Sequence, residues 1–599
     1  MKKIFLLSLV AVFALSLNAQ TYTNLKAKKA PSQVNTTIDT EVGGTLTIPQ
    51  RDPGFALLGT APNIYGIMLA GPHQLMYNSD INTVIAVHRQ NGQAASGALG
   101  FDYSTDGGIT WTNDILISEP TSLCRYPSAT IYNPEGNTDP ANAKVVANGP
   151  LLVDGASWGY TFEIDATLSA TPTTNSFYGS NTGTNEDFHP YGLEMGPDGT
   201  AWSASINYNP TTEEYIGDIF INKAEWNGTK MEWTSPLHTI SPDYYIPAGE
   251  DKLFNGWDVA VDPLDGDHVY AVVNCCVIGD TKDIPSPHVW ETTDGGTTWT
   301  EVVALDFTAE PFATELDNYI IYNEGEEMKP YVVDVDATVD ANGALHIMTT
   351  TYSGAADWGY IYGAFADDGT PSQHYIDYMW NGTEWSMIYI KSLECEDATW
   401  ADVTISAHPE ISRTEDGQNI IYSWSQTYQD ADSLNTAPNI WAKTWNISGN
   451  ETEPLDLTTG TGAAGICYFP QFSPVCIDNG ATIEIPMMIA AIDYASGTDL
   501  DPAMNLYLSG YEVDKAAANV NATVTKPAVT IYPNPVADIL YVSTGANVEL
   551  CDITGKVIVS VNNQDEVKQI QMSNYPAGTY IVKAYTNKGV VSKKVINIK

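Results

Sequence analysis

Three aspartates occupy the same position in three similar segments of this chain. The segments begin DVAVDPLDGD at Asp258, DATVDANGAL at Asp336 and DVTISAHPEI at Asp402. Each aspartate opens a short alternation of apolar and polar residues, which is typical of a β-strand. If these are the innermost strands of a repeat around an axis, the three carboxylates gather at one level. Such a group could take part in catalysis, bind Ca²⁺ or hydrogen-bond sugar hydroxyls, or it could satisfy backbone groups where each strand begins.

Other residues near this level could hold a ligand. Two earlier segments place Ser128 and Gly192 at the level of the aspartates. Neighbouring aromatic rings could stack on a sugar and a cationic side chain could hold an anion, although isolated aromatic residues usually belong to the core. The candidate binding residues are Arg125, His189, Tyr191, Trp257 and Trp400.

The elements that must position these side chains are β-strands. Tyrosine (34) and tryptophan (15) are abundant, glycine (47) and proline (34) are frequent, and no long run has the periodicity of a helix. Seven segments share a pattern of strand, tight turn and strand, followed by a variable hairpin. Four short antiparallel strands repeated about an axis predict an all-β fold, a seven-bladed or alternatively six-bladed β-propeller. The segments are 73–89, 126–149, 191–208, 258–274, 336–350, 402–426 and 468–494.

One eight-residue string occurs twice, as STDGGITW over 104–111 and TTDGGTTW over 292–299. Its aspartate can accept hydrogen bonds from the backbone of a loop, its glycines permit positive φ, and its tryptophan can fold back as an apolar plug. We expect both strings in the hairpin between a blade's third and fourth strands, with a structural role. The fixed positions are Ser104, Asp106, Gly108 and Trp111 in the first copy, and Thr292, Asp294, Gly296 and Trp299 in the second.

This string resembles the Asp-box, or BNR repeat, of sialidase-like β-propellers. The resemblance implies the fold strongly and an activity weakly, because one fold serves many functions. Sialidases hold the substrate carboxylate with three arginines, one of them in an Arg-Ile-Pro motif, and use a tyrosine nucleophile and an aspartate acid/base. This chain has no Arg-Ile-Pro motif and four arginines in all: Arg51, Arg89, Arg125 and Arg413. We expect Arg413 in a turn outside the channel, so the pattern departs from that of sialidases.

The function expected from these features is binding of extracellular glycans or glycoproteins without conventional sialidase catalysis. One alternative is a glycoside hydrolase of sialidase-like fold that uses the channel carboxylates. Another is a structural component of a surface assembly. No cofactor is required for any of these functions, although Ca²⁺ could bind among the carboxylates.

Charge is distributed unevenly along the chain. Residues 31–525 hold 13 basic and 68 acidic residues, a net charge of −55, whereas residues 526–599 carry a net charge of +3. So acidic a segment repels phosphate backbones, which excludes nucleic acid as a partner.

The two ends of the chain differ from its middle. Residues 1–19 have the basic, apolar and small-residue parts of a signal peptide, and no later segment has the about 20 apolar residues that a membrane span needs. We therefore predict an N-terminal extension over 20–62, the propeller over 63–514, a linker over 515–528 and a small β-sandwich over 529–599.

The C-terminal segment resembles the type A C-terminal sorting domain of the type IX secretion system of Bacteroidetes. The resemblance implies export across both membranes, a contact with the secretion machinery, and a location at the outer-membrane surface or outside the cell. It leaves attachment or release open. The matching residues are Tyr532, Pro533, Asn534, Pro535, Gly555, Lys556, Gly578 and Tyr580.

Seven cysteines without regular spacing do not form a disulfide framework. Cys467 and Cys476 could bridge across a hairpin, and most of the others are expected to be small buried apolar residues.

Overall fold

The computed structural model describes residues 54–598, apart from the short segments 70, 72, 153–157, 180–185, 210–213, 245–253, 279–284, 321–329, 355–362, 367–368, 428–433, 493, 495–497, 517–529, 533–535, 544–546, 553–555, 562–566 and 587–588. The predicted signal peptide and most of the predicted linker lie outside the described residues. The chain divides into two compact parts, Met1–Ala517 and Ala518–Lys599, which we call the body and the tail.

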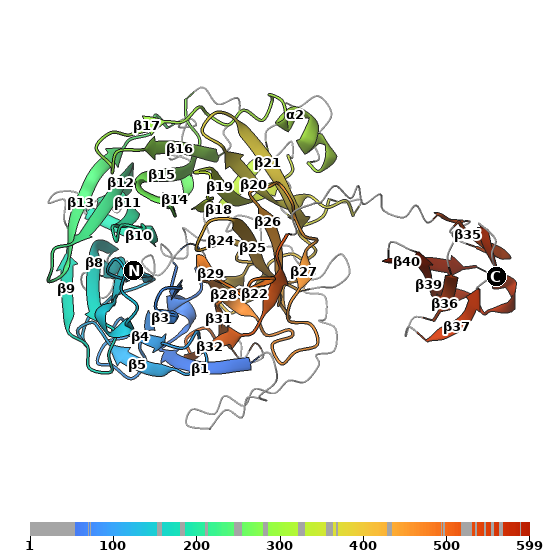
Figure 1. Ribbon diagram of the computed structural model, residues 1–599, viewed down its shortest axis with the longest axis horizontal. Helices are drawn as coiled ribbons and strands as arrows, with labels where there is room; N and C mark the ends of the chain where they lie inside the picture. The colour runs from blue at the N-terminus through green and yellow to red at the C-terminus, as the bar shows by residue number, and fades with distance from the viewer. Residues whose placement is uncertain are drawn as a thin grey trace, which may run out of the picture. The chain divides into compact units, whose positions relative to one another are not determined.

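Within its described residues, the body has seven sets of four antiparallel strands that resemble propeller blades (Figure 1). We number these sets unit 1 to unit 7 in the order of their first strands. Units 1 and 2 are β2 (Leu75–Asn78), β3 (Thr83–Arg89), β4 (Leu99–Ser104) and β5 (Thr112–Leu116), then β6 (Ser128–Tyr132), β7 (Lys144–Leu152), β8 (Trp158–Thr167) and β9 (Thr174–Gly179). Units 3 and 4 are β10 (Glu186–Met195), β11 (Ala201–Asn209), β12 (Glu214–Trp226) and β13 (Met231–Ile240), then β14 (Phe254–Asp262), β15 (Asp265–Cys275), β16 (Ser286–Thr292) and β17 (Thr300–Glu301).

The remaining units follow the same plan. Units 5 and 6 are β18 (Tyr331–Val339), β19 (Leu345–Tyr352), β20 (Gln373–Trp380) and β21 (Trp385–Ser392), then β24 (Glu410–Thr414), β25 (Asn419–Gln426), β26 (Asn439–Asn446) and β27 (Leu455–Asp456). Unit 7 is β28 (Tyr468–Phe472), β31 (Met487–Ala491), β32 (Ala503–Ser509) and β1 (Gly54–Ala61). The sheet of unit 6 is extended by β29 (Val475–Asp478), β30 (Thr482–Glu484) and β33 (Glu512–Asp514), and β22 (Ala398–Trp400) and β23 (Val403–Ile405) form a separate hairpin. Short helical turns are η1 (Ile64–Gly66), η2 (Pro140–Asn142), α2 (Phe312–Glu315) and η3 (Leu316–Asn318).

Unit 7 joins the two ends of the body. Its outer strand β1 pairs antiparallel with β32, with Gly54 opposite Ser509 and Ala61 opposite Ala503. The first strands of successive units contact one another from β2 to β28, and β28 contacts β2. We predicted residues 54–61 within the N-terminal extension, and this is wrong, because they form a strand of the body. Without this strand, β32 would be an open sheet edge.

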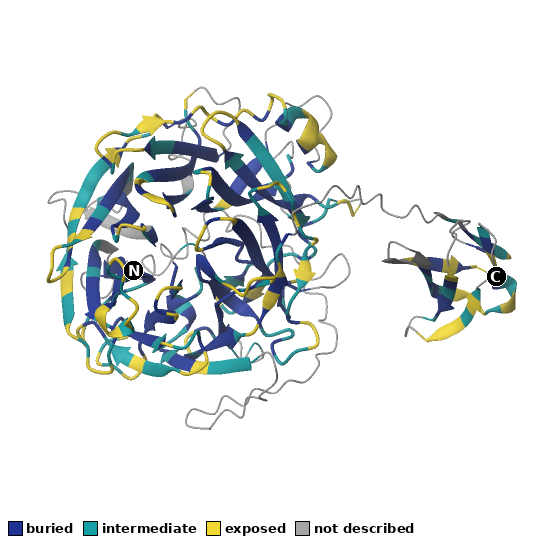
Figure 2. Ribbon diagram, viewed as in Figure 1, coloured by how far each residue is buried: buried dark blue, intermediate teal, exposed yellow. Residues whose placement is uncertain are grey.

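The strands are buried because each unit packs between two others. Every residue of β3 and of β25 is buried, as expected for strands covered on both faces. One core cluster, for example, joins Trp202 of unit 3 to Val259 and Val273 of unit 4. Figure 2 shows the same burial through the inner strands of the body.

The two DGG strings form tight turns between third and fourth strands. In the turn between β4 and β5, Asp106 accepts hydrogen bonds from the backbone N–H groups of Ile109 (3.1 Å) and Thr110 (2.8 Å), and the Thr110 hydroxyl donates at 2.6 Å. Gly108 has φ 93° and donates to Ser104 Oγ at 2.8 Å.

The second string repeats this geometry between β16 and β17. Asp294 accepts from the Thr298 backbone and hydroxyl, both at 2.8 Å, and Gly296 has φ 88°. Trp111 packs on Tyr507 and Trp299 packs on Trp202, so each tryptophan covers a neighbouring unit. All of these contacts hold the turns in place.

The tail has seven described strands in two sheets around one core. The strands are β34 (Thr530–Tyr532), β35 (Ile539–Ser543), β36 (Asn547–Cys551), β37 (Val557–Val561), β38 (Val567–Gln571), β39 (Gly578–Thr586) and β40 (Gly589–Asn597), with the short turn η4 (Met572–Asn574). Tyr580 donates to Pro576 O at 2.8 Å, and Lys556 is exposed. Pro533, Asn534, Pro535 and Gly555 lie outside the described residues.

The seven cysteines are free and buried, so Cys467 and Cys476 form no bridge. No helix among the described residues has both the length and the apolar character needed to cross a bilayer.

Candidate functional site

The first strands, and in unit 1 the residues just before β2, bring one buried polar residue from each unit to a common level near the axis. Asp258 and Asp336 lie at this level, and so does Ser128. Glu194 takes the position we predicted for Gly192, and Glu410 takes the position we predicted for Asp402. We call the complete set the axial ring: His73, Ser128, Glu194, Asp258, Asp336, Glu410 and Gln471.

A bulge in the first strand fixes the level of the ring. In six units, the residue two positions before the ring residue has a positive φ. The pairing of the first strand with the second also changes register there in units 3, 5 and 7. A bulge adds one residue and redirects the side chains that follow, so simple alternation misplaces them. The bulge residues are Gly71, Tyr126, Gly192, Asp334, His408 and Phe469.

The ring carboxylates are used to join neighbouring units. Asp258 accepts a hydrogen bond from the backbone N–H of Ala337 in unit 5 (2.9 Å), and Asp336 accepts one from Ile411 in unit 6 (2.7 Å). Glu194 and Glu410 do the same, with donors Val261 N in unit 4 (2.8 Å) and Phe472 N in unit 7 (3.0 Å). These bonds satisfy backbone groups that would otherwise be buried without partners.

Two pairs also cross the axis. His73 Nε2 of unit 1 lies 3.2 Å from Asp336 Oδ1 of unit 5, and Arg413 Nη2 of unit 6 lies 3.2 Å from Glu194 Oε1 of unit 3. Arg413 is therefore a buried residue of strand β24, and our prediction that it lies in a turn outside the channel is wrong. The ring lies at the centre of the body with its charged groups paired.

Burial and the charges of neighbouring ring residues shift the pKa values of His73, Asp258 and Glu410. Burial alone would lower the pKa of His73, but Asp336, Asp258 and Glu410 raise it to about 10. Burial, and then the charge of Asp336, raise the pKa of Glu410 to about 8 and that of Asp258 well above its usual value. A neutral carboxyl group at these positions costs less than a buried anion.

Asp402 lies away from the ring. It is exposed in the turn of the β22–β23 hairpin, and the first strand of unit 6 begins at Glu410. The alternation of apolar residues does not distinguish the hairpin strand after Asp402 from the first strand at Glu410. Val403 and Ile405 of the hairpin are also buried, in the core shared with units 1 and 2.

The predicted aromatic candidates divide between core and undescribed side chains. Trp257 belongs to the core between units 3 and 4. Trp400 is buried and donates through Nε1 to Tyr494 O at 3.1 Å. His189 and Tyr191 lie on β10, and their side chains are outside the described ones.

Arg125 is different, because it meets a second arginine. Arg89 ends β3, Arg125 precedes β6, and both donate to Ser96: Arg89 Nε to the carbonyl oxygen (2.7 Å) and Arg125 Nη2 to Oγ (3.4 Å). Arg89 Nη1 also donates to Asn63 Oδ1 (2.7 Å), and Arg125 Nη1 to Cys124 O (2.8 Å). Every one of these acceptors is neutral.

Neither guanidinium has an anionic partner among the described residues. Arg89 is 2% exposed. Burial, and then the neighbouring positive charge of Arg125, lower the pKa of Arg89; burial also lowers the pKa of Arg125. A buried cation without a counter-charge is costly, and an incoming anion would relieve that cost.

Two tyrosines accompany the arginines. Tyr126 is buried with φ 39°, and burial raises its pKa while Arg89 and Arg125 lower it. Tyr65, in η1, is half-buried and donates its hydroxyl to Asp499. We call Arg89, Arg125, Tyr65 and Tyr126 the arginine site.

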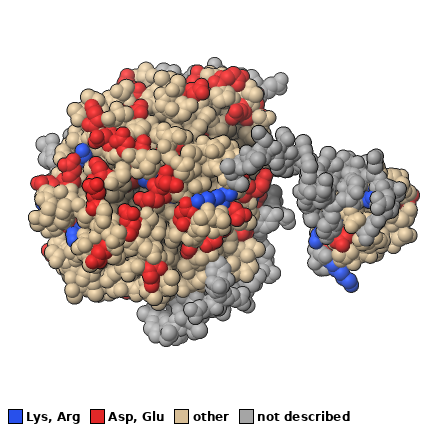
Figure 3. All heavy atoms as spheres, in the orientation of Figure 1, with Lys and Arg blue, Asp and Glu red and all other residues tan. Residues whose placement is uncertain are grey.

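The arginine site and the DGG turns lie at opposite edges of the sheets. In an antiparallel unit, the loop between strands two and three and the loop to the next unit leave one edge, while the other two loops leave the opposite edge. Acidic side chains are spread over the face of the body that Figure 3 shows. In the arginine site, Asp499 accepts a hydrogen bond from Tyr65, and the charges of Asp499 and Asp402 both act on Tyr65, so acidic groups lie near the two arginines without pairing with them.

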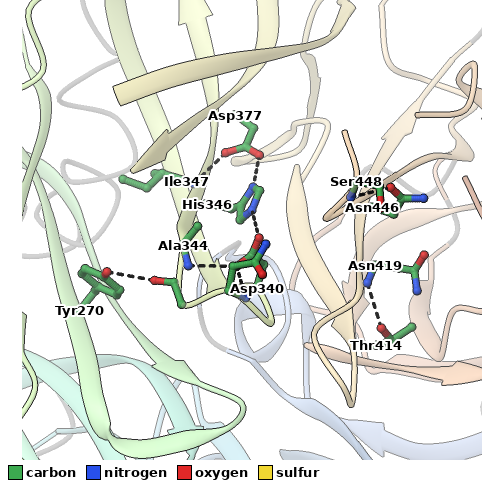
Figure 4. A network of polar contacts seen from close by, with 12 residues as sticks. Tyr270, Asp340, Ala344, His346, Ile347, Asp377, Thr414, Asn419, Asn446 and Ser448 are labelled. Atoms are coloured by element: carbon green, nitrogen blue, oxygen red, sulfur yellow. Dashed lines mark hydrogen bonds and ion pairs between the residues drawn. The ribbon is translucent and has the colours of Figure 1, made fainter. Parts of the chain in front are cut away.

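One further buried polar network is structural. His346 donates through Nδ1 to Asp377 Oδ2 at 2.6 Å, and its Nε2 lies 3.6 Å from Asp340 Oδ2 (Figure 4). Tyr422 of unit 6 donates to the same Asp377 oxygen at 2.7 Å. Because His346 and Asp377 are completely buried, this network ties β19, β20 and β25 together.

Comparison with solved structures finds glycan-processing enzymes. They include an ulvan lyase described as a new family of polysaccharide lyase (TM-score 0.42, 12% identity, 78% of this chain and 97% of that chain). They also include the endosialidase of phage phi92 (0.34, 10%, 91% and 79%) and an α-L-arabinanase of Penicillium chrysogenum (0.31, 12%, 65% and 98%). No curated protein sequence matches the chain.

The tail matches a protein family over residues 530–599, the secretion system C-terminal sorting domain. A domain of this type implies interaction with the secretion machinery. The chain thus carries a sorting domain that indicates export to the cell surface or the extracellular space.

Proposed function

We propose that the body is a seven-bladed β-propeller that, after export by the type IX secretion system, binds carboxylate-bearing extracellular glycans at the arginine site. The observation that carries this proposal is the pair Arg89 and Arg125, which share Ser96 and have only neutral partners among the described residues. A planar guanidinium matches a carboxylate with two parallel hydrogen bonds. A sugar acid supplies that carboxylate together with hydroxyls for the nearby phenols.

The charge of the body makes the arginine pair more informative. Residues 31–525 carry a net charge of −55 and include every arginine of the chain. In such a chain, arginines left without a carboxylate are unusual, because acidic side chains are abundant. Ligand binding gives a reason for keeping two of the four arginines together without a protein counter-charge.

The ring carboxylates favour binding over glycoside hydrolysis at the axis. Asp258 and Asp336 each accept a backbone hydrogen bond from the next unit, and Asp336 also pairs with His73. A catalytic pair of carboxyl groups needs access to a glycosidic bond and freedom to exchange a proton with it. Asp402, the third candidate, lies in an exposed turn away from this level. A role for Ca²⁺ among these three aspartates has no support from their placement.

A second candidate function is cleavage of the same acidic glycan. It is favoured by Tyr126, whose phenol is buried beside both arginines on a residue with φ 39°. Neutralising the sugar carboxylate makes the adjacent C–H more acidic. The ionised phenol could take that proton while a C=C bond forms, the C–O bond to the leaving sugar breaks, and the leaving oxygen takes up a proton from water. In that case Tyr126→Phe removes product formation and leaves binding within a factor of a few, whereas a wild-type chain that forms no new sugar ends from any acidic glycan excludes cleavage.

Binding is tested with the full chain and oligosaccharides of hexuronic acid. Calorimetric titration compares each oligosaccharide with its carboxyl-reduced form and with a sulfated neutral one. We expect binding of the carboxylate form only, and a loss of about tenfold or more in Arg125→Gln, because a charge-assisted pair contributes at least about 1.4 kcal/mol.

The control variant is Lys515→Gln, which removes one positive charge from an exposed pair with Asp478. It should bind like the wild type. Equal binding of the carboxyl-reduced form, or unchanged affinity in Arg125→Gln, would contradict the proposal.

A further inference from the structure

A histidine and two aspartates meet beside the strand that closes unit 7. His88 on β3, Asp102 on β4 and Asp114 on β5 offer ligand atoms that all lie within 4.8 Å of one another. His88 and Asp102 are buried, and Asp114 reaches the surface. One imidazole nitrogen with two carboxylates is a donor set that suits divalent transition metals.

The imidazole is oriented as a ligand. His88 Nδ1 lies 2.9 Å from Arg89 O, to which it donates, so Nε2 is the nitrogen that can bind an ion once it has lost its proton. Nε2 is buried and pairs with Asp102 Oδ2 at 3.0 Å, so a metal ion would take the place of the proton that these two atoms share. Two ligands of a tetrahedral ion with bonds of about 2.1 Å lie about 3.4 Å apart, so the separation of 3.0 Å needs to open only slightly.

The backbone of β1 and β5 holds the carboxylates in place. Asp102 Oδ2 accepts from Gly59 N (2.9 Å) and Oδ1 from Asp114 N (2.7 Å), and Thr60 N donates to Asp114. Each carboxylate oxygen has a second lone pair, so both aspartates can still bind an ion. Two of these three donors belong to β1, the strand that closes unit 7.

Gly59 provides the space for this cluster. A Cβ added at Gly59 would lie 2.4 Å from both His88 Nε2 and Asp114 Oδ1. Any other residue at position 59 would therefore push the histidine and the aspartate apart, although it would remove no ligand.

We propose that His88, Asp102 and Asp114 bind a divalent transition-metal ion, Zn²⁺ in preference to Ca²⁺, and that the ion fastens β1 to unit 1. Ca²⁺ needs six to eight oxygen ligands, whereas Zn²⁺ accepts three protein ligands and a water. Asp114 is exposed, so water can complete the coordination from that side. The site adjoins the arginine site through the bond from His88 to Arg89 O but shares no side chain with it, and it does not depend on the proposed function.

Another histidine in the body serves as a matched control. His268 also lies between two carboxylates, with Nδ1 3.0 Å from Asp262 Oδ2 and Nε2 3.0 Å from Glu291 Oε1. Its two carboxylates bond to opposite nitrogens of the ring, so the imidazole and both carboxylates cannot all reach one ion. This cluster also combines one histidine with two carboxylates, and it should bind no metal.

The test measures metal content and thermal stability of the full chain. Protein is stripped with chelator, dialysed against Zn²⁺, Mn²⁺ or Ca²⁺, and analysed by elemental mass spectrometry and calorimetry. We expect one retained equivalent of Zn²⁺ and a melting temperature that rises with Zn²⁺ and then saturates, because the ion binds only the folded chain. Asp114→Asn and Gly59→Ala should lose both effects, whereas Glu291→Gln should keep them.

Asp114 is exposed, so Asp114→Asn should fold, which circular dichroism checks. Failure of the wild type to retain Zn²⁺ would overturn the proposal. Full retention by Asp114→Asn, or stabilisation by Ca²⁺ alone, would also overturn it.

Discussion

His73 Nε2 of unit 1 lies 3.2 Å from Asp336 Oδ1 of unit 5, although the two first strands are not neighbours in the series of strand contacts. The same Asp336 carboxylate accepts the backbone N–H of Ile411 in unit 6. One side chain therefore connects three units. The aspartate that resembled a catalytic group in the sequence is placed where it joins the body together.

The first prediction concerns Asp336. Its replacement by alanine leaves the raised-pKa His73 and the Ile411 N–H without their partner inside the body, so we expect a loss of about 3–5 kcal/mol in the free energy of unfolding. Urea unfolding followed by tryptophan fluorescence measures this loss. The control is Asp402→Ala, which removes an exposed carboxylate and should change stability by less than about 0.5 kcal/mol. Equal effects of the two variants would argue against a structural ring.

The second prediction separates the charge of Glu410 from its hydrogen bond. Burial and Asp336 raise the pKa of Glu410 to about 8, so at neutral pH the carboxyl group is mostly protonated. Glu410→Gln keeps an acceptor for Phe472 N and should leave stability nearly unchanged at pH 7, or raise it above pH 8. Glu410→Ala should cost about 1–3 kcal/mol because Phe472 N–H loses its partner. A large loss in Glu410→Gln at pH 7 would show that the charge is required.

These variants also show what the sequence could predict. Alternation places Asp258 and Asp336 on first strands, and the DGG strings predict hairpins, because both signals are local. Alternation does not predict Glu194, because a bulge at Gly192 shifts the side chains that follow it. It does not predict Glu410, because the β22–β23 hairpin around Asp402 shows the same alternation. A repeated positive-φ residue is hard to recognise when four units use Tyr, Asp, His or Phe instead of glycine.

Long-range features were beyond the same reasoning. The pairing of β1 with β32 joins residues more than four hundred positions apart. The sequence of β1, GFALLGTA, does not indicate which strand it pairs with. The meeting of Arg89 with Arg125 depends on the loop that places Ser96 between them. The small number of arginines argues against a cluster of three, but it does not predict that Arg89 and Arg125 lie together.

The third prediction concerns the first DGG turn. Asp106→Ala removes the acceptor for three donors of Ile109 and Thr110 and should lower the free energy of unfolding by about 1 kcal/mol. Affinity for acidic oligosaccharides should not change, because the turn and the arginine site lie at opposite edges of the sheets. Calorimetry measures both quantities on one sample. A loss of affinity without a loss of stability would contradict a purely structural turn.

The fourth prediction concerns closure of the body. A chain that lacks Gly54–Ala61 exposes the edge of β32 and should lose cooperative unfolding or aggregate. A chain that ends at Ala517 lacks the tail, a separate compact part, and should keep the melting temperature of the body. Differential scanning calorimetry compares the three chains. If removal of β1 and removal of the tail had the same small effect, the closing role of β1 would be excluded.

The last prediction is a loss of stability in alkaline solution. His73 and His346 are held charged by buried carboxylates, which raise their pKa values to about 10 and about 9, above the about 6.5 of an unfolded chain. A group with a raised pKa contributes stability that is fully present below pH 6.5 and is lost as the pH rises through 9 to 10. Ionisation of Glu410 acts in the same direction between about pH 4.5 and 8, because the folded state binds its proton more tightly.

The melting temperature of the full chain should therefore fall steadily from pH 6.5 to 10 at constant ionic strength. His346→Gln should start lower at pH 6.5 and fall less steeply, since its contribution is already absent; a parallel curve would show that His346 is neutral in the folded chain.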